Sequence, residues 1–200
     1  TVKNTKPIYD FLYEQGILTT KTVWVYPPRD KFTGGCLLDD DYLDFIVGLK
    51  VKGYEIGLHN VGSGKFTRKE IIAGLDIFNS KLGFYPKMQI NHASNPDNIY
   101  WGHERYKFPL ANIIKLIYGK TRQYYGTDIS SEHFWGDKCK EKITYIRNYT
   151  FNSVNTLKID PMMPYIDGTK KEYSNYWFSS SDGHTISEFN SLLNKNNIDK

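Results

Sequence analysis

Strand-like and helix-like segments alternate three times in the first 91 residues, and this alternation limits the fold more than any other feature. The apolar run at 22–26 is followed by a helical pattern at 39–53, which starts with acidic residues and ends at a glycine. A second run at 54–58 precedes a helix that opens with the capping-box pair Thr67 and Glu70 and closes at Gly83. A third strand is predicted at 87–91. The sequence therefore predicts a parallel α/β sheet with right-handed crossovers, either an open doubly wound sheet or a barrel.

The other segments fit the same α/β class. A helix is predicted at 6–15, before the first strand, and further helical pieces at 109–118 and 132–146. The run YWFSS at 176–180 predicts another strand, and the capping-box pattern at 185–188 predicts a last helix. The 200 residues contain no linker, repeat or low-complexity segment, so we expect one domain over 1–200.

Charge and cysteine content argue against several classes of partner. The 26 basic residues are scattered among 22 acidic ones, so the chain-wide balance does not predict nucleic acid or an anionic membrane as a partner. Cys36 and Cys139 lie outside any metal or disulfide pattern, which favours a reducing, cytoplasmic compartment. No apolar run approaches the roughly 18 residues that span a bilayer, and the N-terminal segment lacks the apolar stretch of a signal peptide. The oligomeric state is not indicated.

Polar side chains gather where four predicted strands end. In parallel α/β folds the loops beyond the carboxyl ends of the strands carry the chemistry. A single histidine there is most often structural, but three of the chain's five histidines together with carboxylates predict a functional site. The residues are Arg29, Asp30, His59, Asn60, Asn91, His92, Asp97, Asp182 and His184.

Two interpretations compete for the loop after His59. GSGKFT at 62–67 resembles a phosphate-binding loop, but that pattern requires glycine at His59 and serine or threonine at Phe66. The glycines alternatively permit a tight turn against which His59 simply packs.

Many of the 16 tyrosines, 11 phenylalanines and 4 tryptophans stand in polar contexts such as NIYWGHERY. Ordinary packing explains most of them, but Trp101 in that stretch is predicted to bind a sugar ring.

The chain resembles the polysaccharide deacetylase superfamily, the nodulation-type deacetylases of carbohydrate esterase family four. The resemblance rests on the order of elements, on GYEIGLHN at 53–60, which is similar to the family's G-x-E-I-G-x-H, and on WFSSSDGH at 177–184. INHASNPDNIYWG at 90–102 resembles a divergent branch. The resemblance implies a distorted (β/α) barrel, incomplete at both ends here, that binds one divalent metal, usually zinc. A metal-bound water would attack the N-acetyl carbonyl of an amino sugar.

The resemblance also implies roles for individual residues. His59 matches the first histidine of the family's H-x-x-x-H motif and is the expected metal ligand. Ser63 stands where the second ligand belongs, so His92 or His184 would take its place. Asp182 matches one carboxylate of the family's D-x-x-D-W motif, and an upstream strand that carries the family's aspartate pair is missing from the chain.

Three functions remain open at this point. The first is a metal-dependent hydrolase that deacetylates a sugar or polysaccharide. The second is a metal-free carbohydrate-active enzyme in which the histidines and Asp182 act as general acids and bases. The third is a non-catalytic carbohydrate-binding protein on the same scaffold. The predicted catalytic residues are Asp182, His184 and His92, and the predicted substrate-binding residues are Arg29, Asp30, Asn60, Asn91, Asp97 and Trp101. Arg29 is expected to orient a substrate group or to pair with an acid of the site.

Overall fold

The strands form one mostly parallel sheet in the order β1-β2-β3-β4-β6-β5. The structure, a computed structural model, describes residues 2–92, 95–99, 109–118, 124–152, 156–166 and 175–182. Parallel pairing joins β1 (Thr20–Val23), β2 (Glu55–Leu58), β3 (Met88–Ile90), β4 (Tyr145–Asn152) and β6 (Tyr176–Asp182). The short β5 (Tyr165–Ile166) is antiparallel to β6. The α/β class is confirmed, and within the described residues β1 and β5 are the two edges of an open sheet.

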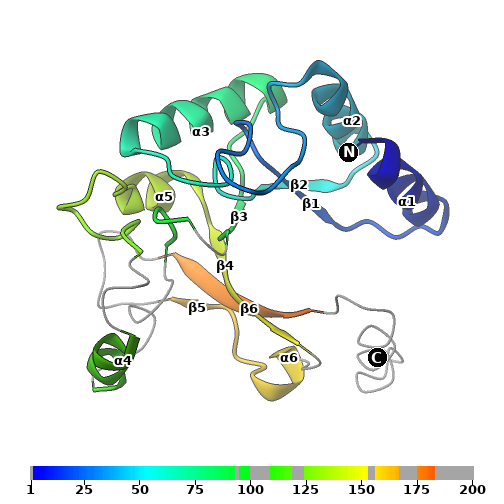
Figure 1. The fold of residues 1–200 in the computed structure, drawn as a ribbon. Coiled ribbons are helices and arrows are strands. Elements are labelled where there is room, and N and C mark those ends of the chain that lie inside the picture. Colours follow the sequence, from blue (N-terminus) through cyan, green and yellow to red (C-terminus); the bar gives the residue numbers. More distant parts are fainter. Residues whose placement is uncertain are drawn as a thin grey trace.

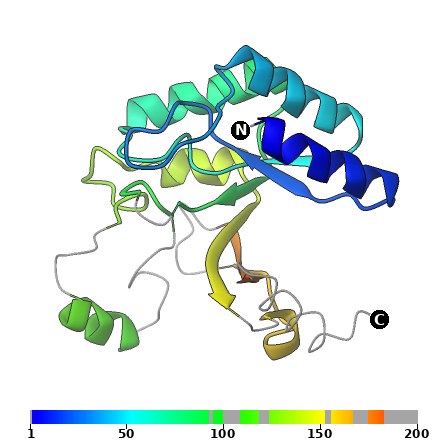
Figure 2. The same cartoon turned by 45° about the vertical axis from the view of Figure 1, so that its right-hand side comes forward.

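The helices fall into two groups (Figures 1 and 2). One group lies together beside β1 and β2 and consists of α1 (Val2–Glu14), α2 (Asp40–Val51) and α3 (Arg68–Leu82). The helix α5 (Gly136–Lys142) lies below α3, and Arg68 of α3 pairs with Asp137 of α5. The short α6 (Thr156–Ile159) lies beyond β4 and β6, and α4 (Leu110–Tyr118) stands apart from the sheet in both views. No helix in the described ranges has both the length and the apolar character needed to cross a membrane.

Local sequence signals explain α3 most fully. The Thr67 backbone N–H donates a hydrogen bond to the Glu70 carboxylate at 2.8 Å, so the capping box forms as predicted. Gly83 ends the helix with φ of 81°, a left-handed conformation that costs glycine little. The side chains of Ile71, Leu75 and Phe78 are buried on one face, which is the periodicity that predicted the helix.

Three predicted boundaries differ from the structure. The first strand occupies 20–23 instead of 22–26, and Trp24 makes only an isolated bridge to Cys36. The first helix spans 2–14 and not 6–15. The helix predicted at 132–146 is wrong at its end, because α5 stops at Lys142 and β4 begins at Tyr145. The β-branched and aromatic residues of YIRNYTFN favour a strand, and pairing with both β3 and β6 buries Ile146.

The core fills the space between the sheet and the helices α2, α3 and α5. Ile46 of α2, Leu58 of β2 and Phe78 of α3 are each fully buried in it. Trp135, at the start of α5, is 1% exposed and is the largest of the fully buried side chains. Close packing of this kind holds the carboxyl ends of β1, β2 and β3 in a fixed relation to one another.

Candidate functional site

Two histidines meet at the carboxyl ends of adjacent parallel strands. His59 directly follows β2, and His92 lies two residues beyond β3. The His59 N–H donates to the carbonyl of Val23 at 2.9 Å, which fixes the backbone of His59 against β1. The centroids of the two imidazole rings are 5.2 Å apart. The structure therefore brings together two of the three predicted site histidines.

Two aromatic rings line the histidine pair. The Trp24 ring lies 6.1 Å from that of His59 and 5.9 Å from that of His92, measured between centroids. Phe32 packs edge-on against His92 at 4.8 Å and keeps 39% of its surface exposed. Neither ring was predicted to belong to the site. Side chains along an extended segment alternate between two faces. Because Val23 and Val25 are buried in the core, this alternation places Trp24 on the opposite face, and that pattern could have indicated it as a site residue.

Both imidazoles are neutral at neutral pH. Burial, together with smaller contributions from His92 and from the positive charges of Arg147 and Lys21, lowers the pKa of His59 to about 3. Burial also lowers the pKa of His92, although the nearby charge of Asp30 opposes that change. A neutral imidazole offers a nitrogen lone pair, which a metal ion or a proton can use.

Asp30 reaches the histidine pair through Ser63. The Ser63 hydroxyl donates to Asp30 Oδ2 at 2.7 Å and lies 3.4 Å from His92 Nε2. Desolvation raises the pKa of Asp30, but the hydrogen bonds from Ser63 and from the Phe32 N–H outweigh it, so the pKa is lowered overall. Ser63 is thus buried between an ionised carboxylate and an imidazole, four residues after His59.

Asn60 connects the loops after β2 and β3. It has a φ of 44°, a left-handed conformation that asparagine adopts more readily than most residues other than glycine. Its Nδ2 donates to Asp97 Oδ2 at 2.7 Å, and its Oδ1 accepts from the His92 N–H at 2.6 Å. The backbone position of His92 is therefore set by Asn60 and, through it, by Asp97.

The loop at 91–99 is held by its own amide side chains. Asn91 exchanges two hydrogen bonds with the backbone of Ile99, and Asn98 donates to the carbonyl of His92. Asn95 donates to the carbonyl of Gly62. All three asparagines are buried, so their hydrogen bonds hold the backbone around His92 without exposing their amides. The substrate contacts predicted for Asn60, Asn91 and Asp97 stay predictions.

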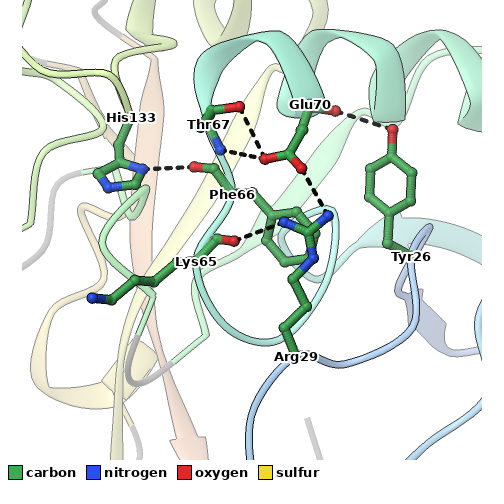
Figure 3. A network of polar contacts seen from close by, with 7 residues as sticks. All are labelled: Tyr26, Arg29, Lys65, Phe66, Thr67, Glu70 and His133. Carbon is green, nitrogen blue, oxygen red and sulfur yellow. Dashed lines mark hydrogen bonds and ion pairs between the residues drawn. The ribbon is translucent and has the colours of Figure 1, made fainter.

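Arg29 makes its contacts at the N-terminus of α3 (Figure 3). Its guanidinium donates to Glu70 Oε1 at 2.7 Å and to the carbonyl of Lys65 at 3.0 Å, and it lies 4.2 Å above the centre of the Phe66 ring. The same Glu70 carboxylate accepts the capping-box hydrogen bond of Thr67. The acid that Arg29 pairs with therefore belongs to a helix cap, and a substrate contact of Arg29 stays a prediction.

We expect Arg29→Ala to lower the free energy of unfolding by about 1 kcal/mol, because it removes a half-exposed ion pair and a cation–π contact. Urea unfolding measures this change. Lys69→Ala, which removes an exposed cation of α3, is the matched control and should change stability by less than about 0.5 kcal/mol. Equal stability of the two variants would show that Arg29 does not support α3.

Three predicted site residues cannot be placed as side chains. Trp101 and His184 lie outside the described residues. The Asp182 backbone ends β6 and pairs in register with Asn152 of β4. Phe178 of β6 is in register with Ile90 of β3 through Arg147 of β4, so Asp182 lies four residues farther along the strand direction than the carboxyl end of β3.

The described side chains supply only part of a metal site. No group of three or more His, Cys, Asp or Glu side chains among them is arranged to hold a metal ion. His92 Nδ1 is nevertheless buried without a hydrogen-bond partner among the described residues, as a nitrogen reserved for a ligand would be. The pair His59 and His92 therefore fits two positions of a metal coordination sphere and leaves the others to further groups.

Comparison of the chain with protein-family models, with curated proteins and with solved structures finds no match in any of the three. The likeness to polysaccharide deacetylases therefore stays a prediction from the sequence motifs.

Proposed function

We propose that this chain is a hydrolase that removes an acyl group, in the simplest case acetyl, from a carbohydrate, and that the reaction takes place at His59 and His92. The observation that carries the proposal is that the centroids of these two neutral imidazoles lie 5.2 Å apart at the carboxyl ends of adjacent parallel strands. We also propose that the fold is the distorted (β/α) barrel of the deacetylases and that the protein is cytoplasmic.

On this proposal His59 and His92 hold one divalent metal ion, zinc in the simplest case. Imidazoles that share a tetrahedral zinc at 2.0–2.1 Å have ring centres about 5 Å apart, which is compatible with the observed pair. His92 then replaces the ligand that the family has at Ser63, and groups other than the two histidines complete the coordination sphere. A bound metal would acidify a water molecule and polarise the acyl carbonyl.

The surrounding side chains have separate roles in the proposal. Asp30 is the ionised carboxylate beside the histidines, and it is placed to accept a proton from water on the exposed side of the site. Asp182 is the other candidate base. Phe32 and Trp24 offer ring faces next to the imidazoles, and such faces suit a sugar ring.

One observation favours a metal-free enzyme as the second candidate. Asp30, Ser63 and His92 form a connected chain of polar contacts, and the described side chains include no third metal ligand. In this alternative His92 and Asp30 exchange protons with substrate and water without help from a metal.

The test combines metal content with acetate release from acetylated sugar oligomers, for the parent, His59→Gln and His92→Gln. His133→Gln is the matched control, because His133 contacts the carbonyl of Phe66, away from the pair. We expect about one metal ion per chain in the parent and the control, and loss of metal with at least a hundredfold slower acetate release in the other two.

Acetate release without bound metal, lost in the same two variants, would favour the metal-free enzyme. Absence of both metal and acetate release, after reconstitution with zinc, manganese or nickel, would overturn the hydrolase and leave a carbohydrate-binding protein.

A further inference from the structure

Ser63 is the middle of a chain of three polar groups that ends at a ring nitrogen of His92. Its hydroxyl donates to Asp30 Oδ2 at 2.7 Å and lies 3.4 Å from His92 Nε2. The other carboxylate oxygen, Asp30 Oδ1, accepts from the Phe32 backbone N–H at 3.0 Å. The carboxylate is therefore held at both oxygens, and the fully buried Ser63 lies between it and the imidazole.

The single hydroxyl proton of Ser63 determines which nitrogen of His92 carries a proton. A serine hydroxyl has one proton to donate and two lone pairs that can accept. The contact with the carboxylate is the shorter of the two and has a charged acceptor, so the proton is donated there. Ser63 Oγ can then only accept from His92, which requires the imidazole proton on Nε2. In a neutral imidazole this leaves the lone pair on Nδ1.

His92 Nδ1 is the free end of this chain of contacts. It is buried and has no hydrogen-bond partner within the described part of the protein. The ring packs edge-on against Phe32 at 4.8 Å and lies 5.9 Å from the ring of Trp24, measured between centroids. The backbone N–H of His92 donates to Asn60 Oδ1 at 2.6 Å. A buried lone pair on a ring held in this way is suited to an electron-pair acceptor, which is a metal ion or a proton.

We propose that Ser63 and Asp30 are positioning residues of the histidine site, which hold the His92 proton on Nε2 and so present the Nδ1 lone pair to a divalent metal ion. Metal-binding histidines generally donate their other ring N–H to a second group, which fixes the tautomer and the ring orientation. Here Ser63 transmits this interaction from His92 to the Asp30 carboxylate. In the metal-free alternative the same lone pair accepts a proton. The role in catalysis rests on the proposed function, whereas the proton position rests on the contacts alone.

The test is to determine which ring nitrogen of His92 carries the proton, by two-bond ¹H–¹⁵N correlation spectra of the full chain at neutral pH. His92→Gln identifies the His92 signals, and we expect the Nε2–H form in the parent. Asp30→Ala leaves the Ser63 proton free to donate to Nε2, so signals of the Nδ1–H form should appear. Asp30 is exposed, and its replacement should not disturb the core.

Zinc affinity, measured by calorimetry with zinc alone, is the second readout. Ser63→Ala removes the group that accepts from Nε2 but keeps the Asp30 charge, so it separates positioning from electrostatic attraction. Zinc affinity should fall at least about tenfold in both Ser63→Ala and Asp30→Ala. Asp44→Ala is the matched control, because it removes an exposed carboxylate of α2 that takes no part in the chain of contacts. It should keep the tautomer and the zinc affinity of the parent.

A His92 proton on Nδ1 in the parent would overturn the proposal. Asp30→Ala and Ser63→Ala variants that keep both the tautomer and the zinc affinity of the parent would also overturn it. A parent that carries the proton on Nε2 but binds no zinc would support the positioning role and contradict the metal-dependent form of the proposed function.

Discussion

Replacing Trp135 by alanine is expected to lower the free energy of unfolding by about 3–5 kcal/mol. Trp135 is 1% exposed and is the largest fully buried side chain, so its truncation leaves a large cavity in the core. Its indole Nε1 also donates to the carbonyl of Asp97 at 2.6 Å, and the alanine variant leaves that carbonyl without its donor. Urea unfolding followed by fluorescence or circular dichroism measures the loss.

Trp135→Phe separates the two contributions, because phenylalanine fills much of the space but has no N–H to donate. We expect this variant to lose about 1–3 kcal/mol, mainly from the unsatisfied carbonyl of Asp97 and a smaller cavity. If Trp135→Ala loses less than about 1 kcal/mol, the indole does not hold the 95–99 loop against α5 as the structure indicates.

The stability of the protein is expected to depend on pH through Asp97. Burial raises the pKa of this carboxyl to about 6, although the hydrogen bond from Asn60 opposes the change. In the unfolded chain the pKa is about 3.9. Above pH 6 the carboxyl is ionised in both states, and the buried charge destabilises the folded state by about 3 kcal/mol, since one pKa unit corresponds to about 1.4 kcal/mol.

As the pH falls from about 6 to about 4, the folded state binds the proton first, so this destabilisation disappears. Asp97→Asn has no proton to bind and keeps an oxygen that can accept from Asn60. The stability of the parent minus that of Asp97→Asn should therefore rise by about 2 kcal/mol between pH 7 and pH 4, where the unfolded carboxyl is itself about half protonated. Other groups, His59 and His92 included, titrate in both proteins, and most of their effect cancels. Parallel pH profiles would contradict a buried, destabilised carboxylate at this position.

Local signals were sufficient for the first half of the fold. The acidic start of α2 and the capping box and glycine of α3 act within a few residues, so sequence patterns place both helices closely. The pattern at 109–118 likewise matches α4. The prediction failed at β4, where a helical pattern was extended to residue 146 although the strand starts at Tyr145. Pairing with β3 and β6 supplies backbone hydrogen bonds that no local pattern records.

The candidate site was predictable as a location but not as a set of contacts. His59 and His92 each follow a predicted strand. Because the carboxyl ends of parallel strands lie on the same side of a sheet, the strand pattern predicts that these histidines lie close together. Ser63 was interpreted only as a lost ligand, whereas it connects Asp30 with His92. Arg29 was expected to orient a substrate group or to pair with an acid; its guanidinium contacts Glu70 in the cap of α3, and its substrate contact stays a prediction.

The sequence by itself determined the order of strands and helices along the chain and the ends of the strands at which the polar residues lie. These properties depend on periodicity and on composition, which act over a few neighbouring residues. Only the tertiary structure decided that Asn60 connects His92 to Asp97 and that Trp24 lines the histidine pair. Each of these depends on the distance between segments far apart in the chain, which packing and desolvation set and which no local pattern contains.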